Sequence, residues 1–252
     1  IALNLLYFRA CRQFYYLGRN TMMTSSTQCI ITCEHAVNTI PDAYQALFQQ
    51  QNDILKTHRA IDFGAQQIAE RFSEILECPL FEATTSRLLI ECNRSLNHPA
   101  CFSEFTQHLT SEEKQVLIDQ YYQPFRQAVQ SEIDKAIRQN KRVIHLSIHS
   151  FTPIFNNIPR QTDIGFLYDP TRLNEKKLAK QWQSTLLKAQ SPYRVRMNYP
   201  YRGTSNGFTT ALRKQYSEHN YTGLEVETNQ ALTMNESKRQ ELAEYLSFSL
   251  KI

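Results

Sequence analysis

The sequence lacks several patterns that mark common classes of protein. No two of its six cysteines form a Cys-x-x-Cys pair, which argues against a zinc ribbon. No stretch approaches the roughly 18 consecutive apolar residues of a membrane-spanning helix. Lysine and arginine are scattered without a basic stripe, and the formal net charge is only +4. We therefore expect neither nucleic acid nor a membrane as a partner, and the positive charge is available for an acidic small molecule.

Composition indicates a soluble globular protein, because 41% of the 252 residues are hydrophobic and 21% are charged. Cys33 and Cys92 end apolar runs, where a free cysteine behaves as a small buried hydrophobe, so we predict reduced thiols and a cytoplasmic location. Residues 1–21 mix aromatics with arginines, and Met22 resembles a natural start. We expect 1–21 to be a non-native or disordered extension and 22–252 to form one domain.

Short β-rich runs alternate with longer helical ones, which predicts an α/β fold with a mostly parallel mixed sheet flanked by helices in three layers. The expected strands are 29–33, 80–84, 87–92, 143–148, 164–168, 193–197 and 222–228. The expected helices are 41–51, 64–76, 110–139, 172–189 and 235–250. Thr110 and Glu113 form a capping-box pattern, and Pro124 predicts a kink within the third helix.

Histidines follow two of the expected strands. His149 comes directly after the apolar run 143–148, and His35 follows 29–33. In α/β proteins, ligands gather beyond the carboxyl ends of the strands. Taken alone, each histidine also fits a core or capping role. Together with a carboxylate, however, two such histidines make the three protein ligands of an open catalytic zinc site, and the chain has no His-Glu-x-x-His helix.

Two carboxylates are candidates to complete that site. Glu34 adjoins His35, but neighbours in an extended segment point to opposite faces, so the two share one ion only across a turn. Asp62 precedes the helix 64–76 and suits a ligand and a helix N-cap equally well.

Arginines and an asparagine suit an anionic substrate. Asn93 and Arg94 follow the expected strand 87–92, and arginine binds carboxylates in a bidentate manner. A surface salt bridge is the alternative. Arg160, Arg202 and Arg213 lie in polar segments rich in glycine, proline and asparagine, where ligand contacts are common.

Glu225 and Glu227 lie in the last expected strand, and alternation places both on one face of it. One glutamate at the end of the strand suits a general base that acts on a water at a zinc ion. A pair of solvated carboxylates on an edge strand is the alternative.

Seven motifs in order resemble the N-formylglutamate amidohydrolase family over about residues 28–250. They are Cys33-Glu34-His35-Ala36 with Ile40-Pro41, Asp62-Phe63-Gly64-Ala65, Ser86-Arg87-Leu88-Leu89-Ile90-Glu91-Cys92-Asn93-Arg94, His149-Ser150-Phe151-Thr152-Pro153, Asp163-Ile164-Gly165, Pro200-Tyr201-Arg202-Gly203 and Glu225-Val226-Glu227. The resemblance implies a fold like that of zinc carboxypeptidases and aspartoacylases, with one zinc ion held by His35 and His149. It also implies that Asn93 and Arg94 clamp the substrate carboxylate. Glu227 is the implied partner of the zinc-bound water, because Glu227 to Leu232 best matches the family's Glu-x-x-x-x-Leu stretch.

The chain departs from the pattern of the related carboxypeptidases. Those enzymes have a His-x-x-Glu pair, whereas Asn38 stands three residues after His35. Asp62 or Glu34 must therefore supply the remaining ligand. Glu91 stands where the family motif commonly has aspartate.

The sequence thus predicts a metal-dependent amidohydrolase that cleaves N-formylglutamate or a related small anionic N-acyl amino acid. Two alternatives stay open at this point. The chain is also compatible with a non-catalytic paralogue that binds an acidic metabolite, or with a hydrolase of larger peptide or cell-wall amides.

Overall fold

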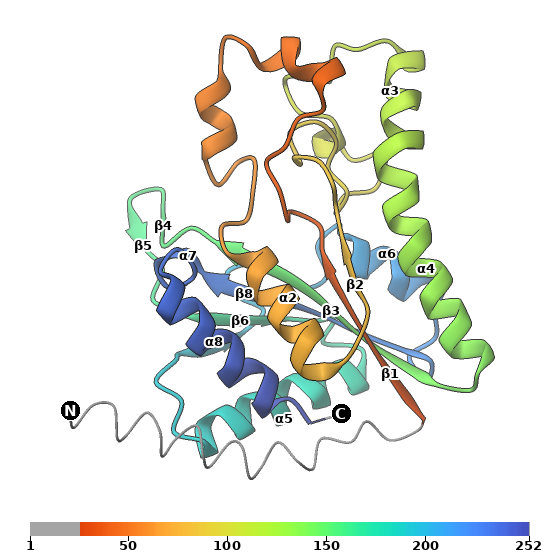
Figure 1. Ribbon diagram of the computed structural model, residues 1–252. Coiled ribbons are helices and arrows are strands. Elements are labelled where there is room, and N and C mark those ends of the chain that lie inside the picture. The colour runs from red at the N-terminus through yellow and green to blue at the C-terminus, as the bar shows by residue number, and fades with distance from the viewer. Residues whose placement is uncertain (1–25, 252) are drawn as a thin grey trace.

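The computed structural model describes residues 26–251, and a sheet of six strands forms its centre, in the order β2-β1-β3-β8-β6-β7 (Figure 1). The strands are β1 (Thr27–Cys33), β2 (Leu80–Glu82), β3 (Arg142–Phe151), β6 (Ile164–Leu167), β7 (Val195–Met197) and β8 (Tyr221–Asn229). The first four in spatial order are parallel, whereas β6 and β7 run antiparallel to β8. The expected mostly parallel mixed sheet is confirmed. The extension expected over residues 1–21 lies outside the described residues.

Helices cover both faces of the sheet and make the expected three layers (Figure 1). The helices α2 (Ala65–Leu76), α5 (Leu173–Lys188) and α8 (Glu236–Ser249) pack on one face. On the other face lie α4 (Gln123–Arg138) and α6 (Phe208–Gln215). The short helix α7 (Gln230–Thr233) follows β8 directly. None of the helices in residues 26–251 is long and apolar enough to cross a membrane.

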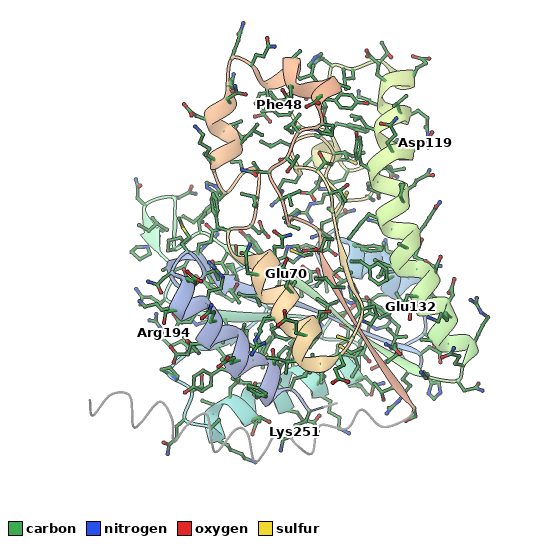
Figure 2. The ribbon with its side chains drawn as sticks, viewed as in Figure 1. Phe48, Glu70, Asp119, Glu132, Arg194 and Lys251 are labelled. Carbon is green, nitrogen blue, oxygen red and sulfur yellow. The ribbon has the colours of Figure 1, made fainter. Side chains whose placement is uncertain are left out.

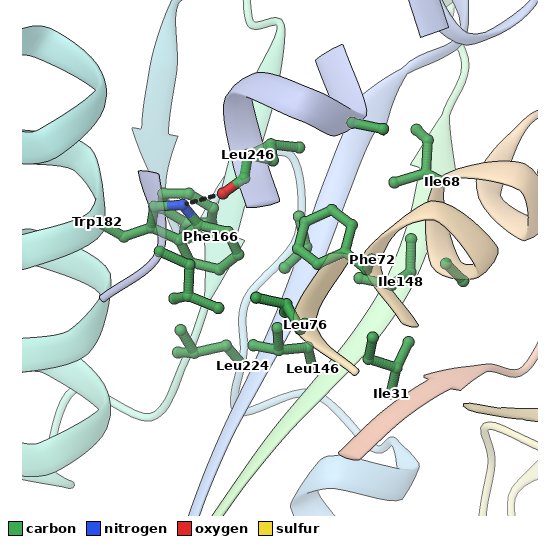
Figure 3. Packing of buried hydrophobic residues seen from close by; sticks show 14 of the residues in the cluster. Ile31, Ile68, Phe72, Leu76, Leu146, Ile148, Phe166, Trp182, Leu224 and Leu246 are labelled. Atoms are coloured by element: carbon green, nitrogen blue, oxygen red, sulfur yellow. Dashed lines mark hydrogen bonds between the residues drawn. The ribbon is translucent and has the colours of Figure 1, made fainter. Parts of the chain in front are cut away.

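The face under α2, α5 and α8 is a hydrophobic core. Trp182 of α5 stacks on Phe166 of β6, with ring centroids 4.5 Å apart (Figure 3). Its indole nitrogen donates to the carbonyl oxygen of Leu246 at 3.1 Å, so this buried polar group is satisfied. Large apolar side chains of three helices and four strands thus hold this side of the sheet together.

The opposite face of the same strands is more polar. Leu146 and Ile148 of β3 belong to the core just described, so alternation sends His145, Ser147 and His149 to the side of α4 and α6. These three side chains are 0–2% exposed. A buried polar layer therefore lies between the sheet and the second pair of helices, where it needs internal hydrogen-bond partners.

A separate hydrophobic cluster caps the molecule beyond the carboxyl ends of β1 and β3. It involves the 3-10 helices η1 (Asp42–Phe48), η2 (Asn52–Lys56) and η3 (Pro99–Cys101) and the helix α3 (Ser111–Leu117). Phe48 stacks on Phe105 at 4.6 Å between ring centroids, and Figure 2 shows it at the end of η1 within this upper region. The helix expected over 41–51 is thus a shorter 3-10 helix.

The strand expected over 87–92 is wrong. This segment forms turns instead, with Leu89 N donating to Ser86 O at 2.9 Å and Arg94 N to Glu91 O at 3.2 Å. Its apolar side chains at 88–90 are 0–5% exposed because they fill the cap cluster. A short apolar run indicates burial, and here burial comes from packing without pairing in a sheet.

The helix expected over 110–139 is helical from Ser111 to Arg138, with the capping box of Thr110 and Glu113 present. The kink at Pro124 stays a prediction, and a π-helical segment, η4 (Ile118–Tyr122), lies just before this proline. Proline lacks the N–H of a regular helical turn, and a π-bulge accommodates that loss. Figure 2 labels Asp119 and Glu132 along this long helix.

Two further features lie where no regular structure was predicted. The helix α6 forms in a segment that was expected to be a polar loop. Its apolar face is too short to show helical periodicity in the sequence. The two-stranded hairpin of β4 (Ile154–Phe155) and β5 (Ile158–Pro159) follows β3. Phe155 of β4 and Asn206, just before α6, line the cavity of the candidate active site.

Gly165 explains how the segment after β7 docks on the sheet. A Cβ at this position would lie 1.9 Å from the carbonyl oxygen of Tyr199, a distance that no real contact allows. The segment that follows Tyr199 carries Tyr201 and Arg202, so the missing side chain of Gly165 permits their placement.

We predict that Gly165→Ala lowers the free energy of unfolding by about 1–3 kcal/mol, because the added methyl must displace rigid backbone. Urea unfolding measures the change. Thr204→Ala, at an exposed position of the same segment, is the control and should unfold like the wild type. Equal stability of the Gly165 variant would show that Tyr199 moves away without cost.

Candidate active site

Three buried side chains converge beyond the carboxyl ends of β1 and β3. The Nδ1 atoms of His35 and His149 lie 3.0 and 2.9 Å from one oxygen, Oδ2 of Asp62. One ligand atom of each residue lies within 4.8 Å of the other two. Two imidazole nitrogens and a carboxylate oxygen are a donor set of catalytic zinc sites.

Adjacent parallel strands bring the two histidines together. His35 lies in the turn after β1, and His149 lies near the end of β3, which pairs with β1. Asp62 comes from the segment before α2, where its backbone N–H donates to His35 O at 3.1 Å. The N-cap of α2 is Gly64, without a side-chain hydrogen bond, so of the two roles left open for Asp62 the cap is not the one it takes.

The other nitrogen of each imidazole faces a second carboxylate. Nε2 of His35 lies 2.7 Å from Oε1 of Glu91, and Nε2 of His149 lies 3.3 Å from Oε2 of Glu34. Such carboxylates fix the orientation of metal-binding histidines and raise their basicity. Glu34 thus lies on the side of His149 opposite to Nδ1, away from the point where the three ligand atoms meet.

The charges of this group balance one another. Burial by itself raises the pKa of Asp62, but the charge of His35 and hydrogen bonding from His149 hold that pKa far below its usual value. Burial lowers the pKa of His149, and hydrogen bonds to Asp62 and Glu34 outweigh this and raise it. Arg87 adds a cation, 2.6 Å from Glu91 and 3.5 Å from Asp62.

Glu227 differs from these carboxylates because it has no matching partner. It lies opposite His149 in the pairing of β3 with β8 and is 5% exposed. Its Oε2 atom is buried and has no hydrogen-bond partner within the described structure. Burial raises the pKa of Glu227 to about 8.

A cavity of about 240 Å³ opens over these residues. Its walls include His35, Asp62, His149 and Glu227, together with Arg87, Asn93, Arg94, Arg202 and Glu225. The expected metal site, general base and most of the expected substrate-binding residues therefore border one space.

Asn93 and Arg94 are fixed against the start of α6. Oδ1 of Asn93 accepts from Phe208 N at 2.8 Å, which aligns its amide, and the Arg94 guanidinium donates to Asn206 O. The amino-terminal end of α6, which favours negative charge, therefore lies beside these two residues. The partner of the Arg94 guanidinium is a backbone carbonyl, so the alternative of a surface salt bridge does not describe this arrangement.

Arg202 and Arg160 occupy different positions. Arg202 is exposed at the mouth of the cavity. Arg160 does not line the cavity. Its guanidinium lies 4.7 Å from the ring centre of Phe155 and 5.4 Å from that of Tyr201, two residues that do. Arg213 is far more buried than expected, and its guanidinium binds Glu175 at 2.9 Å within α6 and α5.

Several residues of the site were not singled out from the sequence. Arg87 and Glu91 lie in one of the motifs but were given no role, although their spacing of four residues could have indicated an ion pair. Ser147, which contacts Nε2 of His149 at 2.9 Å, and Tyr201 carried no signal of their own. Their roles depend on which strands and segments the fold makes neighbours.

The residues present fit a zinc ion. The facing nitrogens and the carboxylate oxygen already meet at one point, and the remaining nitrogen of each imidazole is held by an acceptor. The unpartnered Oε2 of Glu227 lies at the same cavity. Asp62, rather than Glu34, is therefore the carboxylate that converges with the two histidines.

Two solved structures resemble the fold of this chain. A solved gene product of Agrobacterium tumefaciens is 28% identical, with a TM-score of 0.77 and coverage of 89% of each chain. N-formylglutamate amidohydrolase from Ralstonia eutropha is 19% identical, with a TM-score of 0.60 and coverage of 90% of this chain and 93% of that one, and shows the shared fold. Curated proteins give no significant match.

The sequence profile of one family, described as N-formylglutamate amidohydrolase, matches residues 27–234. That match includes both histidines, Asp62, the segment of Asn93 and Arg94, and Glu227. The chain therefore belongs to the N-formylglutamate amidohydrolase family.

Proposed function

We propose that this protein is a zinc-dependent amidohydrolase that cleaves N-formylglutamate or a related small N-acyl amino acid. The observation that carries the proposal is the buried, unpartnered carboxylate oxygen of Glu227 beside the converging His35, Asp62 and His149. An unpaired buried acceptor costs stability, so its presence at a cavity points to a partner supplied by the reaction.

His35, Asp62 and His149 would hold the metal. A bound zinc ion polarises an amide carbonyl and lowers the pKa of water. Glu91 and Glu34 orient the two imidazoles from behind, and Arg87 offsets part of the negative charge of this cluster.

Glu227 serves as the general base in this proposal. Burial raises its pKa to about 8, so it binds a proton more readily than an ordinary carboxylate does. General bases work best when their pKa lies near the operating pH. Glu227 accepts the proton of the attacking water and then delivers it to the leaving nitrogen, which completes hydrolysis to a carboxylic acid and a free amino acid.

The cationic side of the cavity binds the substrate carboxylates. Arg94 and Arg202 supply charge, Asn93 supplies an amide held by Phe208 N, and the amino-terminal end of α6 adds its partial positive charge. Fixing the anionic end of the substrate positions its amide over the metal ligands.

The size of the cavity favours a small substrate over the larger amides considered above. About 240 Å³ is below the roughly 300–1,000 Å³ typical of sites for drug-sized ligands. The complete set of ligand atoms and the free carboxylate of Glu227 likewise favour catalysis over simple binding of an acidic metabolite.

The first test is metal content. We expect about one zinc per chain in the purified protein and its loss in His149→Ala, because one of three ligands is removed. Elemental analysis after dialysis measures the ratio. His219→Ala, which removes an exposed histidine, should keep the metal. Wild-type protein that stays metal-free after incubation with zinc would overturn the metallohydrolase proposal.

We expect Glu227→Gln to lower kcat for N-formylglutamate by about 10²–10⁴-fold while zinc content stays the same, because the glutamine cannot accept a proton. Steady-state kinetics and elemental analysis on one preparation separate the two effects. Glu70→Gln, on the exposed face of α2, is the control. Unchanged kcat in the Glu227 variant would remove that residue from the mechanism.

Arg202→Ala should raise KM for anionic substrates by about 10- to 100-fold, the range expected for a hydrogen bond to a charged group. Its effect should shrink when the substrate carboxylates are replaced by amides. Comparing both substrates in wild type and variant checks this. An equal loss for the charged and the neutral substrate would contradict carboxylate recognition by Arg202.

A further inference from the structure

A chain of buried hydrogen bonds runs from Glu34 down the α4/α6 face of the sheet. Oε1 of Glu34 lies 2.7 Å from Oγ1 of Thr32, which lies 2.8 Å from Nε2 of His145. Nδ1 of His145 in turn lies 2.7 Å from the hydroxyl of Tyr221. All four side chains are 0–1% exposed, and they come from β1, β3, β8 and the turn after β1.

The direction of every hydrogen in this chain follows from Glu34. Both oxygens of the Glu34 carboxylate are acceptors, from Thr32 at 2.7 Å and from Ser147 at 2.8 Å. Thr32 must then donate its single hydrogen to Glu34 and accept from Nε2–H of His145. Burial lowers the pKa of His145 to about 4, so the ring is neutral and its bare Nδ1 accepts from Tyr221.

The second oxygen of Glu34 imposes the same direction on His149. Ser147 donates to Oε2 of Glu34 at 2.8 Å, so its oxygen accepts from Nε2–H of His149 at 2.9 Å. Nδ2 of Asn93 also faces this nitrogen, but at 3.5 Å it is farther away than Ser147 and Glu34. Nε2 of His149 thus carries hydrogen, and Nδ1, 2.9 Å from Oδ2 of Asp62, is the nitrogen that faces the other candidate ligand atoms.

A glycine in β8 makes room for Tyr221 at the far end of this chain of hydrogen bonds. Tyr221 and Gly223 share one face of the strand, and Gly223 pairs with His145. A Cβ on Gly223 would lie 2.6 Å from the Tyr221 hydroxyl oxygen. The ring of Tyr221 therefore lies over Gly223 to reach His145. Because Tyr221 is fully buried, this chain of hydrogen bonds ends inside the protein.

We propose that Thr32, His145 and Tyr221 are positioning residues of the metal site, which hold the Glu34 carboxylate against Nε2 of His149 so that this imidazole presents Nδ1 to the metal. This inference rests on the proposed function for the metal itself, whereas the hydrogen positions between Glu34 and Tyr221 do not require a bound ion. Glu34 is then the point where two arms of hydrogen bonds meet, one from Tyr221 and one from His149.

The variant Glu34→Gln tests the direction of the hydrogen bonds in this chain. An amide has one acceptor where the carboxylate has two, so its NH2 group must donate along one arm. With zinc on Nδ1, the hydrogen of His149 stays on Nε2 and Ser147 keeps donating to the amide oxygen, so the arm through Thr32 reverses and the hydrogen of His145 moves to Nδ1. Nitrogen-15 spectra of histidine-labelled protein, with and without zinc, report these positions, and His145→Gln and His149→Gln assign the signals. We expect Nε2–H on both rings in zinc-loaded wild type and a shift of the hydrogen of His145 to Nδ1 in the zinc-loaded variant. Wild-type hydrogen positions at both rings of the variant would overturn the proposal.

Zinc affinity tests the positioning role without relying on catalysis. Thr32→Val keeps the shape of the side chain but removes its hydroxyl, and should weaken zinc binding by about tenfold or more, as lost outer partners of metal ligands do. Thr32→Ser restores the hydroxyl and should bind zinc like the wild type. Competition with a chromophoric chelator measures all three proteins.

The outcomes separate the two proposals. Equal zinc affinity of the valine and serine variants would show that the chain does not reach the metal site and would overturn the positioning role. Failure of the wild type to bind zinc would overturn the metal proposal instead, while the spectrum of His145 in the metal-free protein would still test the direction of the chain.

Discussion

The pairing of β3 with β1 on one side and β8 on the other is the constraint on which the site depends. Parallel strands end at the same edge of a sheet, so His35 after β1 and His149 in β3 become neighbours although 114 positions separate them. The register of β3 with β8 then places Glu227 beside His149. A slip of one residue would turn both side chains to the opposite face.

Burial around this edge makes electrostatics the second constraint. Glu34, Asp62 and Glu91 are 1–5% exposed, and such carboxylates remain ionised only with close partners. The two imidazoles and Arg87 provide those partners in pairs. Glu227 stands outside this pairing, and burial raises its pKa. The same cluster thus contains three carboxylates with close partners and a fourth, Glu227, whose raised pKa favours binding a proton.

Much of this arrangement was accessible from the sequence, because its signals are local. Apolar runs predicted six strands of the sheet, and helical periodicity predicted α2, α5 and α8. Histidines after strands pointed to the metal site. The order of the strands and the contacts of Glu34 depend on tertiary pairing, which no local pattern encodes. The segment 87–92 shows the limit, since its apolar residues fill a cap between helices where a strand was expected.

The two faces of the sheet place different demands on substitution. Between the sheet and α2, α5 and α8, aliphatic and aromatic side chains meet one another, and exchanges of similar volume alter packing alone. On the α4/α6 face, each of Thr32, His145 and Ser147 gives one hydrogen bond and receives another. Replacing any one of them leaves a buried neighbour without a hydrogen-bond partner. The face of the sheet that carries the candidate active site therefore tolerates single substitutions less well, because a change at one residue requires a matching change at its hydrogen-bond partner.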